Sequence, residues 1–118
     1  MGIDIKLCVN WSFNPEGVSK QHLDDMFALR LTRDYELFEL LREVDRVKLP
    51  KTAQLSLVAG GYTRQDAYGS DLTYTTIGLI KTSKELRRAF KRSSDWNQGV
   101  FALLKRLNKK TPIVFYWH

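Results

Sequence analysis

The sequence has few of the residues that crosslink proteins or bind metal ions. Its 118 residues include one cysteine, Cys8, and two histidines, His22 and His118. A single cysteine cannot form a disulfide within the chain and fits a reducing cytosol, where it most often serves as a small core residue. A metal site needs several converging His, Cys or carboxylate ligands. These three residues have no such spacing, so we expect no metal site and no cofactor.

Long apolar runs are also absent. No run approaches the roughly 18 residues that a membrane-spanning helix needs. Asp4 lies where a secretion signal would have its apolar core, and Lys6 lies where N-myristoylation requires Ser or Thr. We therefore expect a cytoplasmic protein that makes no membrane contact.

Recognisable catalytic motifs are missing as well. Neither histidine lies in a nucleophile motif. Gly60-Gly61 lacks the Lys-Ser/Thr of a phosphate-binding loop and precedes no helix start. Asp66 and Asp71 are a candidate carboxylate pair, but Asp more often serves in turns by bonding to its own backbone. The sequence predicts no catalytic residue.

The composition that remains is that of a folded globule. Hydrophobic residues make up 43% of the chain, charged residues 27% and aromatic residues 12%. Disordered chains are poor in aromatic residues, and this length suffices for one hydrophobic core. We predict a single domain over residues 1–118.

Alternating apolar residues predict an N-terminal strand. They occupy every second position from Ile3 to Trp11, with more polar residues between them, which suits a sheet with one covered face. Further strands are predicted over 54–59, 72–80 and 113–117. The segment 72–80 is rich in the β-branched and aromatic residues that favour sheets. We expect the strands at 54–59 and 72–80 to form a hairpin with the loop 60–71 at its tip.

Four helices are predicted from cap residues and apolar stripes. The first covers 20–29 after Ser19, with Leu23, Met26 and Phe27 on one side. The second covers 35–46 after Asp34, and the third covers 84–92 after Ser83. The fourth starts at Asp95, where Asp95 and Gln98 have capping-box spacing, and its inward positions are Val100, Phe101, Leu103, Leu104 and Leu107.

The predicted element order is β-α-α-β-β-α-α-β. Such an order indicates an α+β fold, here a small, largely antiparallel four-stranded sheet with helices on one face. The two terminal strands are the most apolar, so we expect them to lie side by side in the centre of the sheet.

Positive charge is concentrated in the second half of the chain. The net charge is +6, but residues 81–110 carry ten Lys and Arg against two acidic residues, a net +8. On the predicted helices these cations project away from the core stripes and form a candidate surface for an anionic partner. The alternative is an ordinary solvated face. The candidate residues are Lys84, Arg87, Arg88, Lys91, Arg92, Lys105, Arg106, Lys109 and Lys110. The loop 60–71 offers a second, smaller set: Tyr62, Arg64 and Tyr68.

Three motifs resemble those of small uncharacterised bacteriophage and prophage proteins. The chain starts with Met-Gly-Ile-Asp-Ile, carries Arg-Asp-Tyr-Glu-Leu-Phe-Glu-Leu-Leu-Arg over 33–42 and has Ile-Val-Phe-Tyr-Trp over 113–117. Many of those proteins have a Gly-His-Ser element before a Leu-Thr segment, whereas Gly69-Ser70-Asp71 here lacks the His. The resemblance implies a phage origin, hence the host bacterial cytoplasm, and supplies no activity.

Together these features lead to three functional hypotheses. The first is a non-enzymatic phage accessory protein that binds and inhibits an acidic host protein or a nucleoprotein complex, for example a defence complex, as anti-CRISPR proteins do. The second is a domain that binds nucleic acid without sequence preference, since no sequence-reading motif is present. The third is a small phage enzyme that acts through the loop 60–71.

Overall fold

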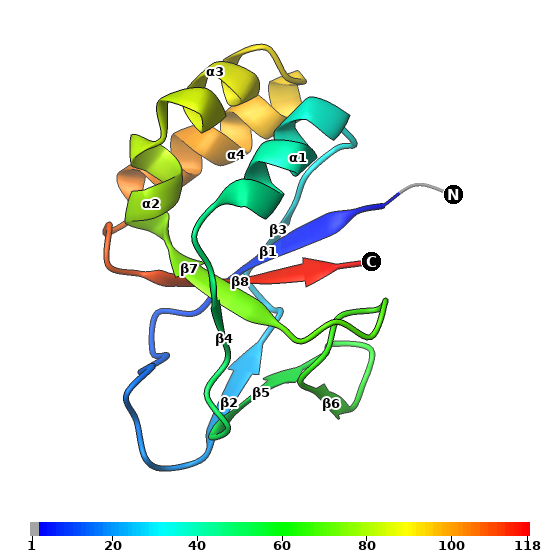
Figure 1. Cartoon of the computed structure of the whole chain (residues 1–118), viewed down its shortest axis with the longest axis vertical. Coiled ribbons are helices and arrows are strands. Elements are labelled where there is room, and N and C mark those ends of the chain that lie inside the picture. Colours follow the sequence, from blue (N-terminus) through cyan, green and yellow to red (C-terminus); the bar gives the residue numbers. More distant parts are fainter. Residues whose placement is uncertain (1–2) are drawn as a thin grey trace.

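The computed structural model describes residues 3–118 as three layers (Figure 1). A five-stranded main sheet lies between four helices and a three-stranded small sheet. Within the main sheet all neighbouring strands are antiparallel, in the order β3-β1-β8-β7-β4. In chain order these strands are β1 (Ile5–Val9), β3 (Ala28–Arg30), β4 (Val47–Lys48), β7 (Thr73–Thr76) and β8 (Pro112–Trp117).

The small sheet and the helix layer cover opposite faces of the main sheet. The small sheet contains β2 (Gln21–Asp24), β5 (Ala53–Ser56) and β6 (Tyr62–Thr63), with β2 parallel and β6 antiparallel to β5. The helices are α1 (Tyr35–Glu43), α2 (Ile77–Thr82), α3 (Lys84–Lys91) and α4 (Asp95–Arg106). The α+β prediction is confirmed, but the predicted element order and the four-stranded sheet are wrong.

The alternation predicted for the first strand is confirmed in part. Ile5, Leu7 and Val9 face the helix core, and Cys8 is fully buried on the opposite face, beneath the small sheet. The sheet therefore has two covered faces where one was predicted. Trp11 lies beyond the strand and is 53% exposed. The Met1-Gly2 part of the phage motif lies outside the described residues.

The terminal strands pair in the centre of the main sheet, as predicted. Ile5 lies opposite Trp117 and Val9 opposite Ile113, so β1 and β8 run antiparallel along their length. Ile113, Val114 and Phe115 are buried, since β8 contributes side chains to both apolar clusters. This strand therefore connects the two cores.

Local capping explains three of the helices. The Asp34 carboxylate accepts the Leu37 N–H at 3.1 Å, and the Ser83 hydroxyl accepts the Leu86 N–H at 3.3 Å. Both caps are as predicted. α4 is capped by Ser94, one residue before the predicted start. Leu103, predicted to face inward, is 44% exposed.

The helix predicted over 20–29 does not exist. Residues Gln21–Asp24 form β2 instead and pair with β5. The Asp24 carboxylate accepts the Met26 N–H at 3.0 Å and closes a turn that ends the strand. Leu23 is buried as predicted, but Met26 and Phe27 are 70% and 52% exposed. The apolar spacing therefore belongs to a strand followed by a turn.

The predicted hairpin of 54–59 with 72–80 is also wrong. β5 lies in the small sheet, whereas β7 lies between β8 and β4 of the main sheet. The second half of 72–80 is the helix α2. Its first N–H groups, of Ile77 and Gly78, donate to the carbonyls of Thr111 and Lys109 at 3.0 and 2.9 Å. These backbone contacts replace a side-chain cap, so no local signal marks this helix start.

Candidate functional site

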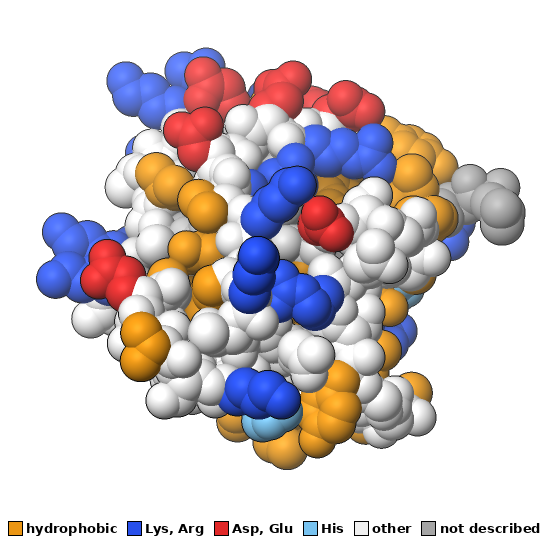
Figure 2. All heavy atoms as spheres, turned by 60° about the horizontal axis from the view of Figure 1, so that its bottom comes forward, with side chains coloured by type: hydrophobic (Ala, Val, Ile, Leu, Met, Phe, Trp, Pro, Cys, Tyr) orange, Lys and Arg blue, Asp and Glu red, His pale blue; other side chains and the backbone are white. Residues whose placement is uncertain are grey.

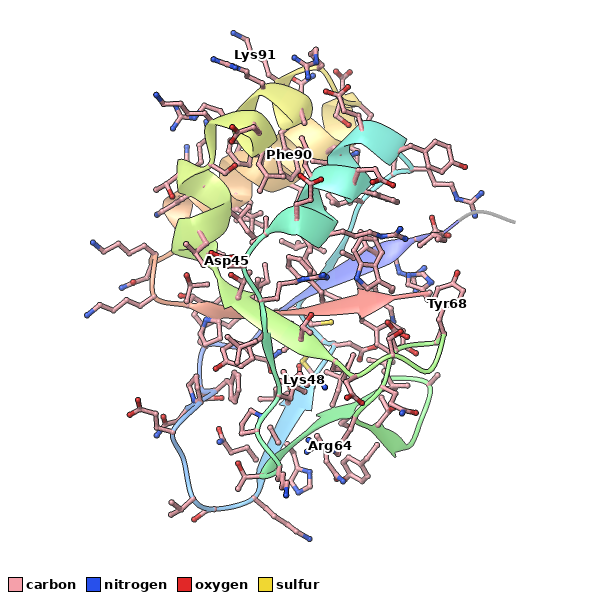
Figure 3. All side chains as sticks on the ribbon, viewed as in Figure 1. Asp45, Lys48, Arg64, Tyr68, Phe90 and Lys91 are labelled. Carbon is pink, nitrogen blue, oxygen red and sulfur yellow. The ribbon has the colours of Figure 1, made fainter. Side chains whose placement is uncertain are left out.

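The nine predicted cations on α3, α4 and the following turn are all exposed. We call this set, Lys84, Arg87, Arg88, Lys91, Arg92, Lys105, Arg106, Lys109 and Lys110, the basic helical face. On α3 the buried residues Leu86, Ala89 and Phe90 fix its orientation. Figure 3 shows Lys91 pointing away from the molecule at the outer end of the helix layer. The predicted direction of these side chains is thus confirmed, while their function stays a prediction.

Part of the basic helical face is opposed by acidic residues of α1, which packs against α3. Arg88 and Arg92 line a hollow together with Glu36 and Glu39 of α1 and Glu85 of α3 itself. Arg92 also forms an ion pair with Glu36. The side of α3 that faces α1 is therefore mixed in charge. None of the ion pairs formed within residues 3–118 includes Lys84, Arg87 or Lys91.

The end of α4 extends the face with a second group of cations. The Lys105 ammonium lies 5.3 Å from the centroid of the Phe101 ring, while Arg106, Lys109 and Lys110 are exposed. Cations at this end also complement the helix dipole. Lys81 has a different role, because its ammonium donates to the Leu107 carbonyl at 2.9 Å and so satisfies the C-terminus of α4.

The loop residues do not join the basic helical face. Arg64 donates hydrogen bonds to three backbone carbonyls, at 2.9 to 3.3 Å, and thereby fixes the segment before β5. Tyr62 is exposed, with its ring centroid 5.0 Å from that of His22. Tyr68 is also exposed. Figure 3 places Arg64 and Tyr68 away from Lys91. Arg64 is thus committed to structural contacts, and the two tyrosines are the accessible members of the predicted loop set.

The two loop carboxylates are occupied by structural contacts. One oxygen of Asp66 accepts the N–H groups of Tyr68 and Ser70 at 2.9 and 3.1 Å, which is the turn role expected of Asp. Asp71 forms an ion pair with Lys48 at 3.3 Å. Within residues 3–118, no three His, Cys, Asp or Glu side chains gather in a way that could hold a metal ion. In the same range, none of the helices has both the length and the hydropathy to span a bilayer.

Sequence reasoning missed an arginine pair at the end of α1. The helix predicted over 35–46 places both arginines on its solvent side, whereas α1 ends at Glu43 and Arg46 lies beyond it. In the structure, the Arg42 guanidinium lies 4.8 Å from the Trp117 ring centroid and that of Arg46 lies 5.8 Å from the Phe115 ring centroid. Burial, reinforced by the neighbouring Arg42, lowers the pKa of Arg46 below its usual value. Only the long-range position of β8 beneath α1 reveals this pair.

A second missed feature is a groove on the small-sheet side of the main sheet, about 750 Å³ in volume. Lys6 and Asp25 form an ion pair at 3.1 Å whose side chains are 14% and 6% exposed. Asp25 also accepts the Val58 N–H at 2.9 Å, so it joins β1 to the tip of the small sheet. His118 lies in the same groove, where burial, with help from Lys6, lowers its pKa.

Positive charge is not confined to the helices. On the face in Figure 2, Lys and Arg side chains run across the middle, and Asp and Glu gather mainly along the upper edge.

A comparison of the chain with known protein families, with curated proteins and with solved structures finds no match. The functional argument therefore depends on the surfaces themselves.

Proposed function

We propose that the protein is a non-enzymatic binding protein that uses the basic helical face to attach to an anionic macromolecule and block it. The observation that supports this is the exposed row of Lys84, Arg87 and Lys91, which enters no ion pair within residues 3–118. Like charges at helical spacing repel by a few tenths of a kcal/mol per pair. Only Lys91, in the last turn, also complements the helix dipole, so folding gains little from this row, whereas an anionic partner would gain from it.

The charge pattern favours an acidic protein surface over a nucleic-acid backbone. Glu36, Glu39 and Glu85 lie beside Arg88 and Arg92, and a uniformly negative phosphate backbone would be repelled there. A protein can instead place cations of its own against these glutamates, and such matched patterns give specificity. In line with the resemblance to small bacteriophage proteins, we propose an acidic host protein, or the protein part of a host defence nucleoprotein complex, as the target.

The test uses charge reversal on α3. The tagged protein is used to capture its partner from bacterial lysate, with and without nuclease, and the dissociation constant is then measured with the purified partner. Binding should survive nuclease, and Arg87→Glu with Lys91→Glu should weaken it about tenfold or more. Both side chains are exposed, so the melting temperature should hardly change.

Lys20→Glu with Lys51→Glu is the matched control, because both lysines are exposed and lie outside the helices. Lys6 is unsuitable as a control because its charge is paired with Asp25. Equal weakening by the two double variants would show that the face is merely solvated. Binding that disappears with nuclease would instead favour the alternative, direct non-specific nucleic-acid binding.

A further inference from the structure

Within residues 3–118, the arginine pair Arg42 and Arg46 forms no ion pair with an acidic side chain. One N–H of Arg46 donates to the Arg42 carbonyl at 2.9 Å, which satisfies one carbonyl of the last helical turn. Within residues 3–118, the Arg46 guanidinium makes no other hydrogen bond, and the Arg42 guanidinium makes none.

Both guanidinium groups border one hollow of about 430 Å³. This volume lies within the range of small-molecule sites. Phe115, Trp117 and Ile3 supply apolar walls, and Tyr68, Ser70 and Thr73 supply hydroxyl groups that can donate hydrogen bonds. The hollow therefore combines two cations, several hydroxyls and an aromatic surface.

Two carboxylates also line the hollow but are already engaged. Asp66 accepts two backbone N–H groups, and Asp71 is paired with Lys48. Both carboxylates keep their negative charge, but neither forms an ion pair with Arg42 or Arg46. Arg46 is partly withdrawn from water beside a like charge, so an anion that reaches both guanidiniums would relieve an unfavourable arrangement.

We propose that this hollow binds a small phosphate monoester, with the phosphate between Arg42 and Arg46 and the organic group against the aromatic wall. Both guanidinium groups line this hollow and lie over Trp117 and Phe115, two rings on the same face of β8, so one tetrahedral dianion can reach both. A carboxylate is satisfied by one guanidinium, which would leave the second arginine unpaired. The site does not involve the basic helical face, so the two proposals stand or fall separately.

Isothermal titration with phenyl phosphate, benzoate and inorganic phosphate tests the assignment. Phenyl phosphate should bind most tightly, because it alone offers both the dianion and a ring for the aromatic wall. Arg42→Gln with Arg46→Gln should weaken its binding about tenfold or more, since each substitution removes charge-assisted hydrogen bonds. Lys20→Gln with Lys51→Gln removes the same charge at exposed positions outside the helices and should leave the binding unchanged.

Three results would overturn the proposal: no binding of phenyl phosphate at millimolar concentration, equal binding of benzoate, or equal weakening by the two double variants. If Arg42→Gln with Arg46→Gln does not fold, Arg42→Gln alone is used, because Arg42 is exposed and its substitution should not unfold the protein. Nuclear magnetic resonance should then show phenyl phosphate shifting the Trp117 and Tyr68 side-chain signals of the parent. Signals that shift only in residues of α3 would count against the site.

Discussion

Single buried side chains connect distant parts of this chain. Asn97 is fully buried, and its amide accepts the Thr32 N–H at 2.8 Å and donates to the Thr32 carbonyl at 3.0 Å. Asn10 makes the same reciprocal pair with the backbone of Asp24, at 3.1 Å in both directions. Each side chain takes the place of a missing strand partner, which matters because unpaired buried backbone groups are costly.

Cys8 gives a prediction at this scale. It is fully buried, and burial raises the pKa of its thiol to about 12. Only the thiolate is nucleophilic, so at pH 8 the folded protein should react with iodoacetamide far more slowly than the urea-unfolded chain, whose thiol has a pKa of about 8.5. Mass spectrometry of timed samples measures the labelling. Labelling of the folded protein at the rate of the unfolded chain would show that β1 is not buried as described.

At the scale of elements, the join between α2 and the turn after α4 has no room for a side chain at Gly78. A Cβ there would lie 2.9 Å from the Lys109 carbonyl oxygen. Gly78→Ala should therefore force the backbone apart and destabilise the protein by about 1–3 kcal/mol, measured by urea denaturation.

Gly99 is the matched control on α4. It is exposed, and a Cβ there would meet nothing within 4 Å. Gly99→Ala should stabilise the protein by roughly 0.5–1 kcal/mol, because Ala is the better helix former. If both substitutions change stability in the same direction, the close approach at Gly78 is not the deciding factor.

The elements that the sequence predicted correctly are those with local signals. α1 and α3 have an Asp or Ser cap and an apolar stripe within one segment, so no distant residue is needed to specify them. β2 has an equally good helical stripe, but its structure is decided by pairing with β5, about thirty positions away. Local spacing cannot contain that information.

The same division applies to the candidate sites. The outward direction of the α3 cations follows from its own apolar stripe, so sequence reasoning found them. Two of the glutamates beside Arg88 and Arg92, Glu36 and Glu39, come from α1, and the aromatic rings beside Arg42 and Arg46 come from β8. Both depend on which elements pack together, which no single segment specifies.

At the scale of the whole molecule, stability should depend on β8. This strand pairs with β1 on one side and β7 on the other, and its side chains enter both cores. Deleting residues 113–118 removes Phe115 and Trp117, each expected to contribute about 3–5 kcal/mol. A domain is usually stable by roughly 5–15 kcal/mol, so the truncated chain should show no cooperative melting transition by circular dichroism.

Phe115→Ala tests the same strand more gently, and Leu103→Ala serves as its control. Phe115 is 1% exposed and Leu103 is 44% exposed. The first substitution should lower the melting temperature clearly and the second only slightly. A truncated chain that still melts cooperatively near the parent temperature would show that the main sheet does not need its central strand.

The central pairing of β1 with β8 also determines how long β1 stays without its main partner during synthesis. Of the strands within residues 3–118, β1 is made first, and its main partner β8 is made last. Until then, Ile5, Leu7 and Val9 have only the short strand β3 beside them and no finished core to cover them. Contacts between such distant segments slow folding, and exposed apolar strands attract other chains in the meantime. A cell making this protein therefore has to shield β1 from other chains until β8 has been made.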